Sequence, residues 1–484
     1  MLSRVFRVHF VGIGGIGMSG IAEVLLVQGW PVSGSDLRNS PLIERLQGMG
    51  ARIHIGHAAA NLGDAEVVVV SSAVTADNPE VTAARALQLP VIPRAEMLAE
   101  LMRLKFGIAV AGMHGKTTTT SMIATVLAAV GLDPTVVVGG RLDAIGSNAR
   151  LGTSDYLVAE ADESDRSFLT LAPIMGVITN LDREHLDCYR DLEDIQNAFV
   201  EFANRVPFYG TVIVGADDAA TRAIVPRIRR RTLTYGLRED SDLRITHAAL
   251  EGLESRFQLR PSPAGAHLLG REQLGCRELG EFRLPRPGMH NVLDATAAVA
   301  VGLLLGRDLD VIRAAIASVS GVERRFQLRG EVGGVRVVDD YGHHPTELAA
   351  TLAAARQVVR SWGGGRVLMV FQPHRFTRTF YLQHEFAQVL TLADQTWLLD
   401  IYPAGEAPIA GVTSAALAHN AQAVGARVEY MASAEAAIAA AAAAARPGDL
   451  ILTQGAGSVS GLGAQLLSAL TATPGVRKQE GRPA

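Results

Sequence analysis

The chain has 484 residues with 48% hydrophobic content, 49 glycines and a formal net charge of −4, which excludes a disordered or fibrous protein and predicts two to four domains. The weak negative charge argues against a nucleic-acid partner, and the basic run at 227–231 is interpreted as a solvated surface. Two cysteines, no signal-peptide pattern and no apolar run near the ~20 residues of a membrane span predict a cytoplasmic protein without a membrane partner.

The first α/β block opens with a predicted strand at residues 6–13, followed by a glycine run and a helix that continues to Val27. Helical segments separate the further strands of this block, which are predicted at residues 31–36, 51–56 and 66–72. This alternation is typical of a nucleotide-binding βα layout.

The glycine run fits G-x-G-x-x-G at Gly12, Gly14 and Gly17, and Asp36 closes the second predicted strand. Glycines at such a turn let backbone N–H groups approach a pyrophosphate at a helix N-terminus. A dinucleotide and a nucleotide-diphosphate sugar satisfy this pattern equally well. A tight turn without any ligand is the third interpretation.

A second glycine loop, "GMHGKTTTT", lies between a predicted strand at 107–112 and a helix. Gly112 and Gly115 leave the backbone free to wrap phosphate oxygens. Lys116 is suited to neutralise the β and γ phosphates, and the Thr117 hydroxyl is suited to coordinate magnesium. The alternative is a helix cap, which the strand–loop–helix context disfavours.

Polar residues follow the next two predicted strands. Glu160 lies at the end of the strand at 155–162, and Asn180 and His185 follow the strand at 174–180. Carboxylate oxygens, with at most an imidazole, suit a magnesium ion beside a phosphate loop. Glu160 as a capping carboxylate and His185 as a loop histidine bonded to backbone remain the alternatives.

The rest of the chain continues the α/β pattern. A helix is predicted at 191–205, short antiparallel strands between 240 and 287, and a third block from Val322. The strands of this third block are predicted at residues 335–340, 366–371, 396–400 and 449–455. The sequence therefore predicts an α/β fold of three domains: a Rossmann-like N-terminal domain, a P-loop-type central domain with a mostly parallel sheet, and a Rossmann-like C-terminal domain.

Eight stretches occur in order along nearly the whole chain: "GIGGIGMSG", "GMHGKTTTT", "EADESDRSF", "NLDREHLD", "PGMHNVLDATAA", "DDYGHHPTE", "QPHRFTRT" and "YPAGEAPIAGV". Together they resemble the Mur ligase family. The phosphate loop is shorter than the full G-x-x-x-x-G-K-[ST] pattern. The resemblance accounts for this, because G-x-x-G-K-T is the form found in this family. It also implies that the first glycine run binds a UDP-sugar rather than a dinucleotide.

The resemblance implies an ATP-dependent amide ligation in peptidoglycan precursor synthesis. L-alanine would be joined to the lactyl carboxylate of UDP-N-acetylmuramate through an acyl phosphate, with ATP as substrate and Mg²⁺ as cofactor. The implied domains are residues 1–106 for the UDP-sugar, residues 107–322 for ATP, and residues 323–484 for closure over ATP and binding of the amino acid.

The resemblance also implies roles for individual residues. The catalytic set is Lys116, Glu160, His185 and Arg325, and the magnesium ligands are Thr117, Glu160 and His185. The ATP-binding set is Gly112, Met113, His114, Gly115, Lys116, Thr117, Thr118, Asn291 and Asp340. The UDP-sugar set is Gly12, Gly14, Gly15, Gly17, Ser35, Asp36, Ser71, Asn148 and Arg150. The amino-acid set is Tyr341, His343, His344, His374, Arg375 and Arg378.

Two other functions remain open. One is the related ligation of a recycled tripeptide to the same UDP-sugar, which the "DDYGHH" and "QPHRFTRT" stretches disfavour. The other is a nicotinamide-dependent oxidoreductase built on the first glycine run. That interpretation leaves Lys116, Glu160 and His185 without a function.

Overall fold

The structure is a computed structural model that describes residues 6–71, 73–142, 147–186, 188–319 and 324–473. The chain forms two compact units, which are described separately: Met1–Thr246, Leu259–Gly280 and Leu293–Val322 in the first, and His247–Gln258, Glu281–Val292 and Glu323–Ala484 in the second. None of the helices in the described ranges is long and apolar enough to span a membrane.

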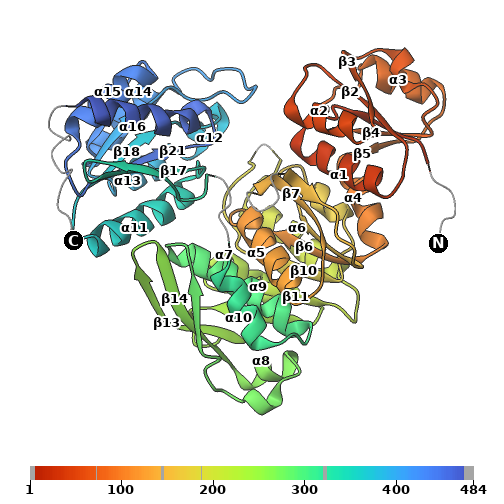
Figure 1. Cartoon of the computed structure of the whole chain (residues 1–484), viewed down its shortest axis with the longest axis horizontal. Coiled ribbons are helices and arrows are strands. Elements are labelled where there is room, and N and C mark those ends of the chain that lie inside the picture. The colour runs from red at the N-terminus through yellow and green to blue at the C-terminus, as the bar shows by residue number, and fades with distance from the viewer. Residues whose placement is uncertain (1–5, 72, 143–146, 187, 320–323, 474–484) are drawn as a thin grey trace. The chain divides into compact units, whose positions relative to one another are not determined.

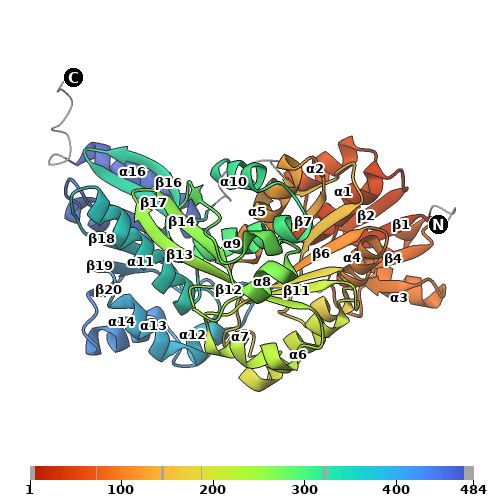
Figure 2. The ribbon, with the colours of Figure 1, turned by 90° about the horizontal axis from the view of Figure 1, so that it is seen from below.

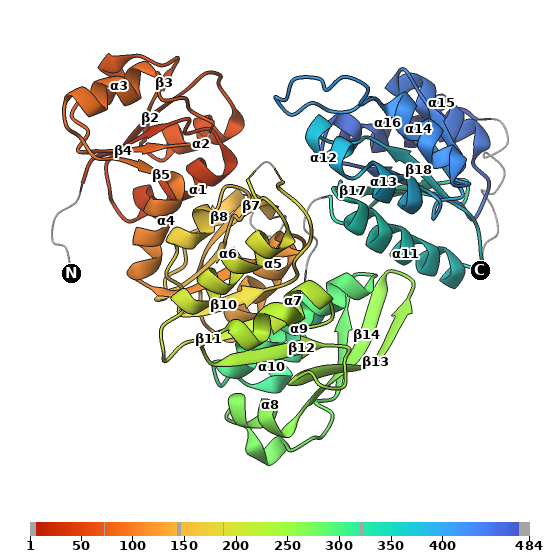
Figure 3. The ribbon, with the colours of Figure 1, turned by 180° about the vertical axis from the view of Figure 1, so that it is seen from behind.

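The N-terminal sheet has five parallel strands in the order β3-β2-β1-β4-β5. Its strands are β1 (Val8–Val11), β2 (Val32–Asp36), β3 (Arg52–Ile55), β4 (Val67–Val70) and β5 (Val91–Pro93). Its helices are α1 (Ile16–Val27), α2 (Pro41–Gly48), η1 (Ala59–Leu62), α3 (Pro79–Ala86) and α4 (Arg94–Arg103). Apolar side chains of α1, α2 and α4 cover one face of this sheet, and α3 and η1 cover the other (Figure 3).

The central sheet has ten strands in the order β15-β14-β13-β12-β11-β10-β6-β9-β7-β8. Their bounds are β6 (Phe106–Ala111), β7 (Thr135–Leu142), β8 (Ser147–Arg150), β9 (Tyr156–Glu160), β10 (Met175–Ile178), β11 (Thr211–Gly215), β12 (Thr232–Gly236), β13 (Leu243–Glu251), β14 (Glu254–Pro261) and β15 (Glu281–Leu284). The strands from β12 through β10, β6 and β9 to β7 are parallel. Nearly every residue of β6, β10 and β11 is buried, as expected for parallel strands covered on both faces.

Helices cover both faces of the parallel part of this sheet. They are α5 (Lys116–Ala129), η2 (Ser167–Thr170), α6 (Leu192–Arg205), α7 (Ala219–Ile224), η3 (Val225–Arg227), α8 (Pro263–Leu268), η4 (Glu272–Leu274), α9 (Met289–Leu304) and α10 (Leu309–Ala317). Figure 2 shows α5 and α10 on one face of the sheet and α6 and α7 on the other. The phosphate-loop segment therefore lies between two helical layers.

The C-terminal sheet has six strands in the order β16-β17-β21-β18-β19-β20. Its elements are β16 (Gln327–Val332), β17 (Val335–Asp340), α11 (Pro345–Ser361), β18 (Val367–Phe371), α12 (Phe376–Tyr381), α13 (Gln383–Leu390), β19 (Gln395–Leu398), α14 (Ser414–Ala423), β20 (Val428–Tyr430), α15 (Ala434–Ala444), β21 (Leu450–Gln454), η5 (Ser458–Gly461) and α16 (Leu462–Ala472). Only β16 is antiparallel to its neighbour. Side chains of α11, α13 and α14 pack on one face, and those of α15 and α16 on the other. Figure 1 shows β17, β18 and β21 of this sheet between α16 and α11.

The predicted α/β class with three sheet-containing domains is confirmed, and so are the short antiparallel strands after residue 240. The predicted strand ends are less accurate. The strand expected at 396–400 runs from Gln395 to Leu398 in the structure, and the strand expected at 66–72 ends at Val70. Residue 72 and the predicted boundary between residues 322 and 323 lie outside the described residues.

Candidate active site

The second glycine loop connects β6 to α5, as its sequence predicts. Gly112 has φ +139° and Gly115 has φ +83°, conformations that L side chains rarely adopt. A Cβ added at Gly112 would clash with Thr179 Oγ1, and one at Gly115 would lie 2.6 Å from Asp294 Oδ1. Both glycines are therefore required by backbone conformation and by close neighbours.

Hydrogen bonds from the end of β10 hold this loop in place. Met113 N donates to Asn180 O at 3.2 Å, and His114 N donates to Asn180 Oδ1 at 2.9 Å. The Asn180 amide donates in return to His114 O at 2.9 Å, and His114 Nε2 lies 3.0 Å from Asp182 Oδ2. Contacts within the protein thus hold the loop.

Lys116 begins α5 and turns its amine back toward the loop. Its Nζ donates to Gly112 O at 2.7 Å and to Glu163 Oε1 at 2.8 Å. Burial alone would lower the pKa of Lys116, but the nearby carboxylates of Glu163, Asp162 and Glu160 outweigh it and raise that pKa. Lys116 is therefore held as a cation at the point where a phosphate loop needs one.

The three predicted magnesium ligands lie around the same loop. Thr117 is in the first turn of α5, Glu160 ends β9, and His185 lies in the loop after β10 with φ +55°. His185 Nε2 is 3.4 Å from Oε1 of Glu163, whose side chain is 1% exposed. The other oxygen, Glu163 Oε2, is buried and has no hydrogen-bond partner among the described residues. Such a buried carboxylate oxygen, on the residue that contacts His185, is the kind of ligand that magnesium prefers, and the assignment of Thr117, Glu160 and His185 to this ion stays a prediction.

Asp294 in α9 also contacts the phosphate-loop segment. It is 6% exposed and accepts a hydrogen bond from Thr119 Oγ1 at 2.9 Å, next to Gly115. Thr118, predicted to bind ATP, is 5% exposed in the same turn of α5. Asp294 fixes the first turn of α5 and therefore the direction in which the loop amides point.

The first glycine run forms the turn from β1 to α1. Gly12 has φ +83°, and the amide of Gly14 donates to Asp36 Oδ2 at 2.9 Å. Gly15 directly precedes α1, and Gly17 lies in its first turn. Asp36, predicted only to end the second strand and to belong to the UDP-sugar set, contacts this loop directly, and its carboxylate at the end of β2 holds the turn.

Ser35 belongs to a buried polar network rather than to an open surface. Its hydroxyl donates to Glu80 Oε2 at 2.5 Å and lies 2.9 Å from His57 Nδ1. Glu80 also accepts from Asn61 Nδ2 at 2.5 Å, and its Oε2 lies 3.3 Å from His9 Nε2. Burial opposes the ionisation of Glu80, but these hydrogen bonds outweigh it and lower its pKa to about 2. Through this network, Ser35 fixes the end of β2.

The other predicted UDP-sugar residues are dispersed in the first unit. Ser71 follows β4, and its Cβ would lie 3.3 Å from a Cβ added at Gly12. Arg150 ends β8, where it forms an ion pair with Asp133. The side chain of Asn148 lies outside the described residues.

One cavity of about 280 Å³ lies between the first turn of α1 and the start of α5, the two helices that follow the glycine loops. It is lined by Gly17, Arg94, Lys116, Val137, Val138, Glu160 and Asp162. The structure therefore brings predicted residues of the UDP-sugar and ATP sites to the walls of the same space.

The second unit contains the remaining predicted nucleotide residues. Asn291 is 3% exposed, and its amide nitrogen lies 2.7 Å from Pro287 O and 3.0 Å from His290 Nε2. Asp340 accepts from the amides of Phe326 and Gly342 at 2.9 and 2.8 Å. Both side chains thus stabilise the loops around them, and their predicted roles in ATP binding stay predictions.

Aromatic rings gather beyond the carboxyl ends of β17 and β18. The ring centroids of His343 lie 5.3 Å from those of Tyr341 and His374, and His374 stacks on Tyr402 at 5.5 Å. Arg378 Nη1 donates to His374 O at 3.0 Å. Four of the six predicted amino-acid residues therefore lie in one cluster, with Tyr402 as an additional member.

The other predicted residues of this unit have structural contacts. His344 caps α11, where its ring accepts from Thr346 N at 3.3 Å and Glu347 completes a capping box. Arg375 has φ +72° and lies 3.9 Å from Glu406. The guanidinium of Arg325, predicted to be catalytic, lies 3.6 Å from Glu347 Oε1.

Comparison with known proteins supports the family resemblance along the chain. The profile "Mur ligase family, catalytic domain" matches residues 7–106, "Mur ligase middle domain" matches 110–302, and "Mur ligase, glutamate ligase domain" matches 324–457. A UDP-N-acetylmuramate–L-alanine ligase of Koribacter versatilis is 56% identical, covering 98% of this chain and 99% of the relative. A protein of the same name from Solibacter usitatus is 55% identical, covering 97% of this chain and 96% of the relative.

This chain belongs to the Mur ligase family. A solved structure, the UDP-N-acetylmuramate-alanine ligase of Thermotoga maritima, matches it with a TM-score of 0.75 and 27% identity, covering 96% of this chain and 99% of that one. A murein peptide ligase of Psychrobacter arcticus matches with a TM-score of 0.66 at 23% identity, covering 99% of this chain and 100% of that one, and shows the common fold.

Sequence reasoning missed several residues of this Mur ligase site. Glu163 and Asp162 lie in the quoted stretch "EADESDRSF", in which the sequence predicts only Glu160 as a site residue. Asp294 lies in the quoted stretch "PGMHNVLDATAA", whereas Arg94 lies outside the quoted stretches. Their contacts could not be predicted locally, since their partners Thr119 and Asp162 are 175 and 68 residues away in sequence. The charged residues inside a quoted stretch could have been predicted from the sequence. The contacts between residues far apart in the sequence are known only from the fold.

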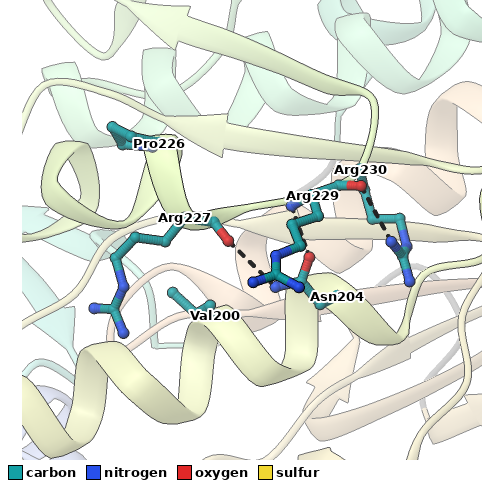
Figure 4. Close-up of a pocket in the computed structure, with 6 residues that line it drawn as sticks. All are labelled: Val200, Asn204, Pro226, Arg227, Arg229 and Arg230. Carbon is teal, nitrogen blue, oxygen red and sulfur yellow. Dashed lines mark hydrogen bonds between the residues drawn. The ribbon is translucent and has the colours of Figure 1, made fainter.

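A second cavity, of about 560 Å³, lies at a different edge of the central sheet of this Mur ligase. It is lined by Val200, Asn204, Pro226, Arg227, Arg229 and Arg230 (Figure 4). Its arginines precede β12, whereas the phosphate loop follows β6, and both strands belong to the parallel set. The arginine cavity therefore lies at the amino ends of the strands, away from the candidate active site.

Proposed function

We propose that this chain is an ATP-dependent ligase that joins L-alanine to the lactyl carboxylate of UDP-N-acetylmuramate, in peptidoglycan precursor synthesis. The observation that carries this proposal is the 56% identity, over 98% of the chain, to a relative with that name. The phosphate loop also supports the proposal, because Lys116 is held there among carboxylates as a cation that can meet the phosphates of ATP.

The first chemical step activates the carboxylate, which cannot expel oxide on its own. One oxygen of the lactyl carboxylate attacks the γ-phosphorus of ATP, the bond from that phosphorus to the β–γ bridging oxygen breaks, and ADP leaves. The Lys116 ammonium neutralises charge on the transferring phosphoryl group. When bound by Thr117, Glu160 and His185, Mg²⁺ would supply further neutralisation of phosphate charge.

The second step forms the amide. The neutral amine of L-alanine attacks the acyl carbon, the tetrahedral intermediate collapses, and inorganic phosphate leaves with the bonding electrons while the amine releases a proton to solvent. An arginine grips a carboxylate with two hydrogen bonds, which suits Arg378 or Arg375 to the alanine carboxylate. The cluster of Tyr341, His343 and His374 would surround that amino acid.

We propose the same domain roles as the sequence indicates: residues 1–106 for the UDP-sugar, 107–322 for ATP and 323–484 for the amino acid. The glycine turn held by Asp36 supports the first role, and the loop held by Asn180 supports the second. The aromatic cluster around His374 supports the third.

The test measures phosphate release from ATP by the purified chain with magnesium and UDP-N-acetylmuramate. We expect release with L-alanine and formation of the alanyl product by mass spectrometry, and no product when any one substrate is left out. Product formed with the tripeptide but not with L-alanine would assign the chain to the related recycling ligation. Turnover of a nicotinamide cofactor without ATP would overturn the ligase proposal.

A further inference from the structure

The cavity between the two glycine loops has two chemically different ends. Gly17, in the first turn of α1, and Arg94 line one end, while Lys116 and Glu160 line the other. Asp162 bridges them, because its Oδ2 lies 3.2 Å from Arg94 Nη2 and its charge contributes to the raised pKa of Lys116. A substrate that spans this cavity would present one group to each end.

Arg94 reaches the first turn of α1 from a neighbouring helix. It is the first residue of α4, directly after β5, and its side chain is 23% exposed. A Cβ added at Gly17 would lie 3.1 Å from Cδ and from Nη1 of Arg94. Glycine at this position therefore allows the guanidinium to lie against the helix N-terminus, where backbone amides favour anions.

Arg94 is the cation at the α1 end of the cavity, and its partner there is Asp162. Among the residues that line the cavity, Lys116 and Arg94 are the two cations, and Glu160 and Asp162 are the two acids. Lys116 already pairs with Glu163 and faces the loop that would hold ATP. A UDP-sugar with a diphosphate and a carboxylate needs compensation at its own end of the cavity, because carboxylates otherwise repel it.

We propose that the Arg94 guanidinium binds the diphosphate of the UDP-sugar at the N-terminus of α1 and so directs the sugar toward Lys116. This inference rests on the proposed function for the identity of the sugar nucleotide. A planar guanidinium forms paired hydrogen bonds with phosphate oxygens, and Gly17 leaves space for this contact. On binding, the diphosphate takes the place of Asp162 as the partner of Arg94.

The test is a series of ligands that adds one recognised group at a time. Uridine, UDP and UDP-N-acetylmuramate are titrated into the full-length wild type and into Arg94→Gln, by NMR for uridine and calorimetry for the others. We expect Arg94→Gln to bind both diphosphates about 10- to 100-fold more weakly, with uridine binding unchanged. Arg94→Lys is expected to recover part of the loss, since lysine keeps the charge without the fork.

Two further variants separate substrate binding from a structural role. Asp162→Asn removes the ion pair but keeps Arg94, so we expect its affinity for UDP to be retained or increased. Arg103→Gln changes an exposed arginine at the other end of α4 and is expected to leave all three affinities unchanged. An equal loss of UDP affinity in Asp162→Asn and Arg94→Gln would overturn the inference, because the ion pair alone would then matter.

The outcome also separates this inference from the proposed function. If the wild type ligates L-alanine to UDP-N-acetylmuramate and Arg94→Gln binds UDP as tightly as wild type, the Arg94 assignment is wrong and the ligase stands. Equal weakening of uridine and UDP would likewise overturn it, because the diphosphate would not be the group recognised. A wild type that binds neither UDP nor UDP-N-acetylmuramate would overturn both.

Discussion

Glu163 connects two residues of the predicted catalytic set, Lys116 and His185. Its Oε1 lies 2.8 Å from Lys116 Nζ and 3.4 Å from His185 Nε2, so two residues with predicted catalytic roles share one carboxylate. Tyr189 donates to the backbone oxygen of Glu163 at 2.6 Å, which fixes the segment that carries it. A lysine in a buried loop would lose its proton more easily without such a partner.

Replacing Glu163 by glutamine should therefore shift the pH dependence of the ligation. The carboxylate raises the pKa of Lys116, so its removal lowers that pKa and the protonated, active form is lost at a lower pH. We expect the alkaline limb of the pH–rate profile to move to lower pH, with a fall in kcat/KM of about 10- to 100-fold. Glu201→Gln, at an exposed glutamate of α6 paired with Arg205, is the matched control. An alkaline limb that stays in place would show that Glu163 does not set the charge of Lys116.

The magnesium ligands make a separate residue-scale prediction. If Thr117, Glu160 and His185 hold magnesium, His185→Ala should raise the magnesium concentration for half-maximal rate by about 10-fold. Glu160→Gln should cost more, because a carboxylate is the stronger ligand for a hard cation. Magnesium titrations of the two variants at saturating ATP measure this order. An unchanged titration for His185→Ala would leave that residue as a partner of Glu163 only.

Among the elements, the turn from β6 to α5 requires glycine at two positions. Gly112 and Gly115 take positive φ, and both are crowded by residues of other elements. Asn180 holds the loop from β10, and Asp294 contacts the first turn of α5 through Thr119. The protein's own contacts thus hold the loop from two sides, which reduces the ordering cost of nucleotide binding.

Gly112→Ala tests this crowding against a second glycine of positive φ that has open space around it. Gly131, after α5, also has positive φ, but nothing lies within 4 Å of a Cβ added there. We expect Gly131→Ala to lower the free energy of unfolding by about 1–2 kcal/mol, and Gly112→Ala by about 3 kcal/mol or more. Urea unfolding measures both changes, and calorimetry with ATP measures nucleotide affinity. Equal destabilisation by the two variants would mean that the contact with Thr179 is relieved without cost.

The sequence predicted those elements whose signals are local. Buried strands such as β6 and β10 are apolar runs, and glycines with a lysine mark the phosphate loop, so both could be located from neighbouring residues. The contact between Lys116 and Glu163 joins residues 47 positions apart, and that of Thr119 with Asp294 joins residues 175 apart. Strand order decides such contacts, and no local pattern contains it. The resemblance predicts that His344 binds the amino acid, but its local position gives it another role. It directly precedes Pro345 and caps α11.

At the scale of the whole molecule, the two predicted nucleotide loops belong to different sheets of one compact unit. The first glycine run follows β1 of the five-stranded sheet, and the phosphate loop follows β6 of the ten-stranded sheet. The cavity that contains Gly17 and Lys116 joins them, so a sugar nucleotide and ATP can meet without sharing a loop. Such a division predicts that the two binding reactions are separable by mutation.

Lys116→Ala is the variant that tests this separation. Removing the ammonium should lower the rate of amide formation about 1000-fold or more, because phosphoryl transfer depends on charge neutralisation at the loop. The affinity for UDP-N-acetylmuramate should stay within about twofold of wild type, since we propose that this nucleotide binds at the other loop. Lys105→Ala is the matched control, because Lys105 is the other lysine of the described residues and its Nζ only donates to Ser154 O at 2.5 Å. Calorimetry with UDP-N-acetylmuramate and product formation at saturating substrates give the two readouts. A parallel loss of sugar-nucleotide affinity in Lys116→Ala would place that ligand on the phosphate loop itself and would contradict the assignment of the two loops to two substrates.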